Sequence, residues 1–250
     1  MTRLYHWEPS GDSLKMLIAL KEKNVPFESR YVDLLDLEHH GEAFKSVADH
    51  DRVPLLIDQG EALKDSQFAL QYLAEAYAPR LAPADPAGWY DVQAWTSQLD
   101  QVLAPSVRMV GWHTVTFPSM GDDDRADFLK RSADVPRPQV MAGWAEVTSD
   151  AEASEDQLAN ARERIGQVVD RIEAALAGSD WIVGDGFSII DINAFARVHT
   201  LPRLLPDLVN SERTPRIMAW IERIRQRPSV QDALTMRRAS LGEDIYAPMV

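Results

Sequence analysis

A single change in hydrophobic periodicity divides this 250-residue sequence into two parts. Through about residue 80, short β-prone runs alternate with stretches of helical spacing, as in an α/β unit. Between Pro79 and Pro86 the chain carries three prolines and the pattern stops. Beyond that point nearly every apolar stripe has helical spacing. The sequence therefore predicts an α/β domain over 1–80, a linker at 79–87 and an all-helical domain over 88–250.

The α/β part has the order β-α-β, a short helix, then β-β-α. Expected strands and helices lie at 4–7, 14–25, 27–33, 52–57, 61–64 and from Asp65-Ser66 onward. Asp12 or Ser10 can cap the first helix. Pro54 cannot donate to a sheet ladder, so we expect it at the beginning of its strand or on an edge, and the preceding peptide bond is a candidate for the cis form.

The helical part contains several helix-start signals. Ser188 and Asp191 form a capping box, and Thr214-Pro215 has the favoured cap-then-proline order. Pro105 should kink or end the helix that carries it. The segment 121–156 is rich in acid, proline and alanine, and is either a mobile insertion over a cleft or a solvated connection, of which we favour the second.

Composition excludes several function classes. There is no cysteine, so disulfides, thiolate metal sites and a cysteine nucleophile are ruled out. The net charge of −13 disfavours nucleic acid as a partner. No apolar run is long enough for a membrane span, and the N-terminus has no signal-peptide pattern, so we expect a cytoplasmic protein.

The order and spacing of these features resemble the cytosolic glutathione transferases, from about Arg3 to Leu234. The features are the β-α-β, β-β-α unit, Val53-Pro54, Asp65-Ser66 and the capping box of the helical domain. At a finer level the chain resembles bacterial glutathione-dependent β-etherases, which open aryl ether bonds of lignin fragments. That likeness lies in short runs at 4–5, 9–15 and 110–113, and in Pro136 with Trp144 eight residues on.

The resemblance implies an N-terminal thioredoxin-like domain that binds glutathione, which would supply the thiol that this chain lacks. The thiolate is the reactive form, and a helix N-terminus and a hydroxyl can stabilise it. Ser13 matches the catalytic position of the family, with Ser10 as the second candidate. Alternatively, Ser13 is only a first-turn residue of its helix.

Other glutathione contacts follow from the same resemblance. The Val53 backbone before Pro54 would pair with the cysteinyl backbone, and the helix start at Asp65-Ser66 would bind the γ-glutamyl carboxylate. Most relatives have glutamate in place of Asp65. His40 and Arg52 are candidates for the glycyl carboxylate, or are simply exposed polar residues.

We expect the electrophile to bind between the domains. The candidate residues are Trp7, Trp112, His113 and Trp144, with the tryptophans stacking on aromatic rings and His113 donating to an oxygen. The alternatives are that the tryptophans belong to the core and that His113 is packed or solvated.

The predicted reaction is cleavage of a β-aryl ether ketone by glutathione, which releases a phenol and requires no metal. One alternative is a general glutathione transferase, isomerase or dehalogenase. Another is a non-catalytic binding protein of the same fold. Two departures from the family pattern support it: Asp65, and Asp51-Arg52, where many relatives have glycine and glutamine. The family resemblance also implies a homodimer.

Overall fold

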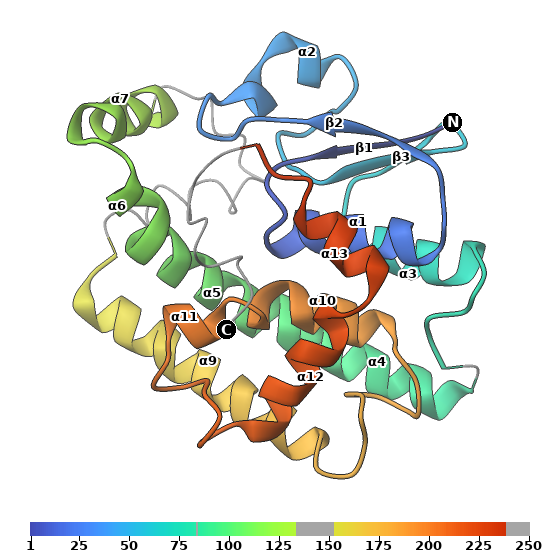
Figure 1. Ribbon diagram of the computed structural model, residues 1–250. Helices are drawn as coiled ribbons and strands as arrows, with labels where there is room; N and C mark the ends of the chain where they lie inside the picture. Colours follow the sequence, from blue (N-terminus) through green and yellow to red (C-terminus); the bar gives the residue numbers. More distant parts are fainter. Residues whose placement is uncertain (84, 134–152, 239–250) are drawn as a thin grey trace.

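The computed structural model describes residues 1–83, 85–133 and 153–238 and contains a sheet domain followed by a helical domain (Figure 1). The first domain has eight elements: β1 (Thr2–His6), α1 (Gly11–Glu22), β2 (Phe27–Tyr31), η1 (Glu38–His40), α2 (Glu42–Lys45), β3 (Leu55–Asp58), β4 (Glu61–Leu63) and α3 (Ser66–Ala76). The expected order β-α-β, short helix, β-β-α is therefore confirmed.

The four strands form one mixed sheet in the order β2-β1-β3-β4. β1 pairs parallel with β2 and antiparallel with β3, and β3 pairs antiparallel with β4. Because strand side chains alternate between faces, Leu4 and Leu56 enter the core with α1 and α3, while Leu55 packs with Phe44 of α2. Helices thus cover both faces of the sheet (Figure 1).

Val53-Pro54 is a cis peptide bond, and Pro54 directly precedes β3. The predicted position of this proline at the beginning of its strand is confirmed. The β1–β3 ladder begins with the Tyr5–Leu55 pair, so the Val53 backbone lies outside it.

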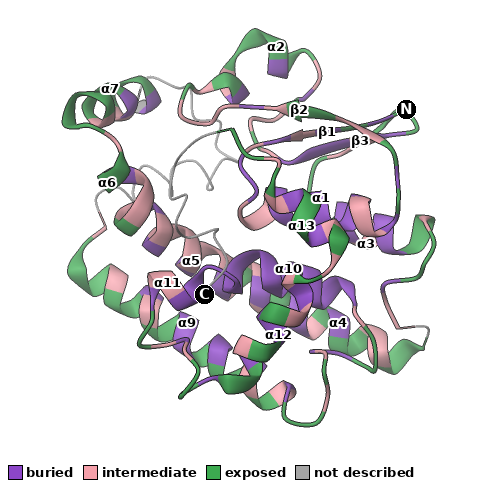
Figure 2. Ribbon diagram, in the orientation of Figure 1, coloured by how far each residue is buried: buried purple, intermediate pink, exposed green. Residues whose placement is uncertain are grey.

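The helical domain begins at Pro86. Its elements are α4 (Pro86–Gln98), η2 (Leu99–Leu103), α5 (Ala104–Gly111), η3 (Trp112–Thr116), α6 (Phe117–Ser119), α7 (Asp122–Ala133), α9 (Glu155–Ala175), α10 (Ile189–Val198), α11 (Leu201–Leu204), α12 (Pro215–Arg225) and α13 (Pro228–Leu234). Every residue of α10 is buried, so this helix is the centre of the domain (Figure 2).

The predicted capping box at the start of α10 is confirmed. Asp191 is fully buried, and its carboxylate accepts hydrogen bonds from the Ser188 and Ile182 amides, the Ser188 hydroxyl and the Trp220 indole at 2.9–3.1 Å. Burial raises the pKa of Asp191, although these donors act in the opposite direction. The acid therefore has a structural role.

Two π-helical turns interrupt the long helix that runs from α4 to α6. Each turn ends two residues before a proline, η2 before Pro105 and η3 before Pro118. A proline has no N–H to donate to the carbonyl four residues earlier. A π-turn, which is wider than an α-helical turn, lets the helix continue without that hydrogen bond. The predicted interruption at Pro105 therefore takes the form of a π-turn.

Part of the acidic segment 121–156 is ordered secondary structure, which corrects its description as a solvated connection. Residues 122–133 form α7, and the Phe128 side chain is 1% exposed and packs with Trp112 and Phe117. The apolar residues of this helix were too few for the sequence pattern to reveal it.

α1 lies between the two domains and contacts α10 and α13 as well as α3. A bidentate ion pair between Arg227 and Glu22, with distances of 2.6 and 2.8 Å, joins the N-cap of α13 to the end of α1. None of the described helices is both long and apolar enough to cross a membrane.

Candidate active site

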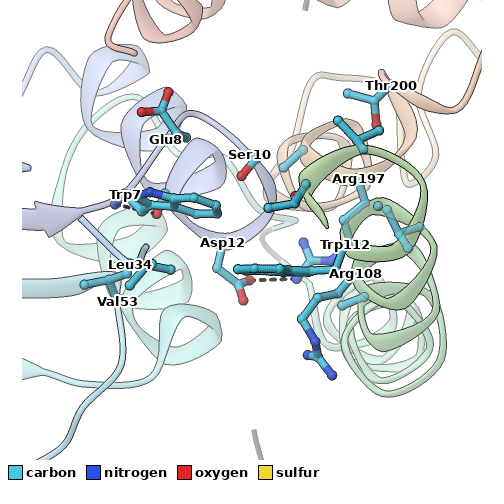
Figure 3. Close-up of a pocket in the computed structure, with 18 of the residues that line it drawn as sticks. Trp7, Glu8, Ser10, Asp12, Leu34, Val53, Arg108, Trp112, Arg197 and Thr200 are labelled. Carbon is cyan, nitrogen blue, oxygen red and sulfur yellow. Dashed lines mark hydrogen bonds and ion pairs between the residues drawn. The ribbon is translucent and has the colours of Figure 1, made fainter. Parts of the chain in front are cut away.

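Two neighbouring cavities lie between the domains. The first has a volume of about 360 Å³ and the second about 470 Å³. Six residues line both: Asp12, Arg52, Val53, Ala104, Arg108 and Arg197. Figure 3 shows the first cavity, with Trp7, Ser10 and Asp12 on one wall and Arg108 and Trp112 on the other. A ligand that extends from one cavity into the other would pass the beginning of α1.

Ser13 lies in the first turn of α1 and lines the first cavity. Its residue is 5% exposed, and its Oγ accepts a hydrogen bond from the Trp7 amide at 3.1 Å. A hydroxyl that accepts through its oxygen still has its own proton to donate. The Trp7 amide thus orients Ser13 in a way that leaves a donor for an anion in the cavity.

Ser10 is the N-cap of α1, as one of the two sequence alternatives predicted. Its side chain makes no capping hydrogen bond, and it also lines the first cavity. Gly11 follows with a φ of +47°, a conformation that favours glycine and that turns the chain into the helix. Two hydroxyls, those of Ser10 and Ser13, therefore flank the positive end of the α1 dipole.

An ion cluster with two buried cations holds the beginning of α1 against the helical domain. Asp12 Oδ1 lies 2.9 Å from Lys15 Nζ and 2.7 Å from Arg197 Nη2, and Arg197 Nη2 lies 3.0 Å from Asp100 Oδ1. Lys15 and Arg197 are 1% and 3% exposed. Two cations and two carboxylates balance, so the acid in the first turn does not leave a net negative charge beside Ser13.

The expected tripeptide-binding residues gather at the second cavity. Arg52, Val53 and Pro54 line one part of it, and Asp65 and Ser66 line another at the start of α3. The Asp65 carboxylate accepts from the Gln67 and Phe68 amides at 2.8 and 3.1 Å. Two of the helix amides that we expected to be open to a ligand are therefore already used by this cap, which leaves Ser66 as the accessible group at this helix start.

His40 is not brought to either cavity wall. Its side chain is 9% exposed, and its Nδ1 lies 3.3 Å from Asp51 Oδ2. The adjacent His39 lines the first cavity instead, and burial together with the nearby His40 lowers the pKa of His39 to about 3. The histidine at the cavity is thus the residue next to the predicted one in the short helix η1. The sequence contains no signal that distinguishes His39 from His40.

The aromatic wall has a different form from the one we expected. Trp112 stacks on Trp7 with ring centroids 5.9 Å apart and on Phe128 at 6.1 Å, and it is 6% exposed. Two aromatic rings are thus stacked on Trp112, and little of its surface is left for a substrate ring. Trp112 therefore packs with other aromatic side chains, as the alternative of a core tryptophan expected, and also lines the first cavity, where stacking on a substrate ring stays a prediction.

Comparison with known proteins now identifies the family. The model of the glutathione S-transferase N-terminal domain matches residues 4–81, and that of the glutathione S-transferase C-terminal domain matches residues 135–228. The chain belongs to the glutathione transferase family. The sequence-based resemblance and the predicted fold class are both confirmed.

Individual relatives of this transferase cover almost its whole length. Protein LigF of Sphingobium sp. strain SYK-6 is 29% identical over 92% of this chain and 91% of its own. Mouse glutathione S-transferase theta-1 is also 29% identical, over 92% of this chain and 79% of its own.

Solved structures show the same fold. The crystal structure of β-etherase LigF from Sphingobium superposes with a TM-score of 0.82 at 28% identity, over 94% of this chain and 98% of that one. The Phanerochaete chrysosporium transferase URE2P8, solved with oxidised glutathione, superposes with a TM-score of 0.72 at 19% identity, over 95% of each chain.

Two other predicted substrate residues are not part of the described site. His113 of this transferase lies in η3 but does not line either cavity, because the residues of that turn that face the first cavity are Trp112, Val115 and Thr116. Trp144 falls outside the described residues. Trp7 does line the first cavity.

Sequence reasoning missed several residues of the transferase site. The first cavity also contains Arg108, Val107, Thr116, Thr200 and Leu204, and the second contains Lys64, Asp100 and Gln101. Arg108 precedes Trp112 by one helical turn, so the spacing of four could have placed both on one face. The remaining residues come from distant segments that no local pattern connects.

Proposed function

We propose that this transferase uses glutathione to cleave β-aryl ether bonds in aromatic ketones, with release of a phenol. One observation carries the proposal: a polar cavity and an aromatic cavity meet at the beginning of α1, beside the Ser13 hydroxyl. The similarity to LigF over nearly the full chain supports the same reaction class.

The polar side chains that line the second cavity suit the charged groups of glutathione. The tripeptide carries two carboxylates and one ammonium group. Arg52, Lys64 and the Ser66 hydroxyl suit the carboxylates, and the acids Asp65 and Asp100 on the same cavity suit the ammonium. Val53, outside the sheet ladder, offers its backbone to the cysteinyl residue between them.

With glutathione in this orientation, its sulfur would enter the first cavity near Ser13. The Ser13 proton and the α1 dipole would stabilise the thiolate, which is the nucleophilic form. The Trp7 amide holds Ser13 Oγ at 3.1 Å, so this donor is oriented before the ligand arrives.

The thiolate would attack the carbon that carries the aryloxy group, next to the ketone. A carbon–sulfur bond forms, the carbon–oxygen bond breaks, and the phenolate leaves with the bonding pair. Attack from the side opposite the leaving group inverts that carbon. The aromatic wall of the first cavity supplies orientation rather than chemistry.

A comparison of acceptors tests this proposal. Purified protein with glutathione should release phenol from a fluorogenic β-aryl ether ketone and should act more slowly on a simple chloroaromatic acceptor. Turnover of the chloroaromatic acceptor without any turnover of the ether would favour a general conjugating transferase and overturn the etherase assignment.

Glutathione binding is tested separately by thermal denaturation. A ligand that binds only the native state raises the midpoint as its concentration exceeds the dissociation constant. A shift with reduced glutathione is expected. No shift at millimolar glutathione would contradict a glutathione-dependent activity and favour the non-catalytic alternative.

We also propose a homodimer in solution. Phe68 on α3 and Tyr90 on α4 are 64% and 74% exposed, which is unusual for large aromatic side chains of a monomer. One residue belongs to each domain, which suits an interface in which the first domain of one chain packs on the helical domain of the other.

A further inference from the structure

Arg108 lies where the two cavities meet, on the wall that faces α1. Three residues of the helical domain line both cavities: Ala104, Arg108 and Arg197. Arg108 is half-buried on α5, one turn before Trp112. Figure 3 shows it across the cavity from Ser10 and Asp12. A group that reacts with a sulfur beside α1 would therefore lie between the two walls.

The two other arginines that line both cavities lie in different surroundings. Arg197 Nη2 lies 2.7 Å from Asp12 and 3.0 Å from Asp100, and its Nη1 donates to Asn193 Oδ1 at 2.6 Å. These bonds fix the Arg197 guanidinium inside the ion cluster. Arg52 is exposed and lies beside Val53, on the wall that suits the tripeptide.

The displacement reaction moves a full negative charge. The charge is on sulfur at the start, beside Ser13 and the α1 N-terminus, and on the phenolic oxygen at the end. Ser13 would stabilise the thiolate before the reaction as well as during the attack, so it raises the amount of thiolate more than the rate of carbon–oxygen cleavage. A rate increase requires a donor where charge develops, at the leaving oxygen.

We propose that Arg108 is a second catalytic residue, whose guanidinium donates a hydrogen bond to the phenolic oxygen as the carbon–oxygen bond breaks. The inference rests on the proposed ether cleavage. The first cavity is lined by apolar side chains, Val107, Val115 and Leu204 among them, as well as by charged groups, and a bound aromatic ketone would displace water from it, which strengthens a hydrogen bond to the leaving oxygen. The phenolate takes its proton from solvent after it leaves.

The test is a series of ether ketones that differ only in the leaving phenol, from an acidic nitrophenol to a weakly acidic methoxyphenol. For Arg108→Met we expect kcat to fall about 100-fold with the methoxyphenol ether and less than about tenfold with the nitrophenol ether, because a good leaving group needs less help. Arg108→Lys keeps the charge and should recover part of the loss with the methoxyphenol ether.

Two further measurements complete the design. The thiol pKa of bound glutathione, followed by ultraviolet absorbance, is measured for wild type and Arg108→Met, and the two rates are compared at a pH above both values, so that the remaining loss reports on the oxygen rather than the sulfur. Arg164→Met, an exposed substitution on α9, is the matched control and should retain wild-type rates throughout the series.

The outcomes separate this inference from the proposed function. No phenol release by wild type with any ether would overturn both. An active wild type whose Arg108→Met and Arg108→Lys variants fold, but lose the same factor with every leaving group, would overturn the role of Arg108 alone.

Discussion

At the residue scale, the candidate site depends on two serines whose environments differ. Ser13 is buried and oriented by the Trp7 amide, whereas Ser10 caps α1 through its backbone only. Fixed donors stabilise a developing or bound anion more than mobile ones, because they need no reorganisation. Orientation therefore favours Ser13 as the thiolate partner.

Substitution of the two serines tests this choice. Ser13→Ala should raise the thiol pKa of bound glutathione by about one to two pH units and lower kcat/KM by about 100-fold at neutral pH. Ser10→Ala is the matched control and should change kcat/KM less than about threefold. The reverse pattern would transfer the catalytic role to Ser10.

A second residue-scale prediction concerns the buried His199. Burial, with a contribution from Arg225, lowers the pKa of His199 to about 3 from its usual 6.5. The ring is therefore neutral in the folded state and becomes protonated in the unfolded state below pH 6.5. Its contribution to stability is complete above pH 6.5 and is lost as pH falls toward 3.

Between about pH 6 and pH 4, His199 should reduce the free energy of unfolding by about 1.4 kcal/mol for each pH unit. His199→Gln should remove that part of the slope. The measurement is urea denaturation of wild type and variant over this range. Parallel slopes for the two proteins would show that His199 does not contribute.

At the element scale, the beginnings of helices were the most predictable features. The Ser188–Asp191 capping box, the Asp65-Ser66 start of α3 and the Thr214-Pro215 start of α12 each combine local signals that hold within one turn. Pro105 likewise marked an interruption, although the sequence did not show that it would be a π-turn.

Elements that depend on distant packing were not predictable. α7 has few apolar residues, and its Phe128 is buried only because Trp112 and Phe117 meet it there. The exchange of His39 for His40 and the Trp7–Trp112 stack have the same origin. Each depends on contacts with other segments of the chain, in the case of Trp7 and Trp112 across the two domains, and local periodicity does not contain such contacts.

The central position of α10 leads to a stability prediction. Asp191→Ala removes the acceptor of four donors, the Ser188 amide and hydroxyl, the Ile182 amide and the Trp220 indole, and the Ser188 amide bond is also part of the capping box. Each unsatisfied buried donor costs about 1–3 kcal/mol, so the free energy of unfolding should fall by at least about 3 kcal/mol. Urea denaturation of wild type and variant measures this change in the free energy of unfolding. A change below about 1 kcal/mol would contradict this role.

At the scale of the whole molecule, α1 connects function to architecture. It carries Ser13 at one end, where Asp12 and Arg197 join it to α10. At the other end Glu22 and Arg227 join it to the start of α13. The site is therefore a product of the domain interface. The sequence predicted an α/β part followed by a helical part, but not the ion cluster of Asp12, Lys15, Asp100 and Arg197 that joins them.

The proposed dimer gives a prediction at the same scale. Phe68→Glu and Tyr90→Glu each place a charge in the proposed interface, which should raise the dimer dissociation constant at least about tenfold because unpaired charges are costly to bury. Sedimentation analysis measures the change, with Arg164→Glu on α9 as the control. Unchanged association in both aromatic variants would place the interface elsewhere.

The central claim is that the sulfur of glutathione, at the beginning of α1, displaces a phenol from the ether carbon. Its most direct test is the product balance, measured by mass spectrometry after reaction of the purified protein with reduced glutathione and a β-aryl ether ketone. We predict one glutathione thioether of the ketone for each phenol released, and no phenol when glutathione is omitted. Phenol released without glutathione, or without formation of the thioether, would contradict this mechanism.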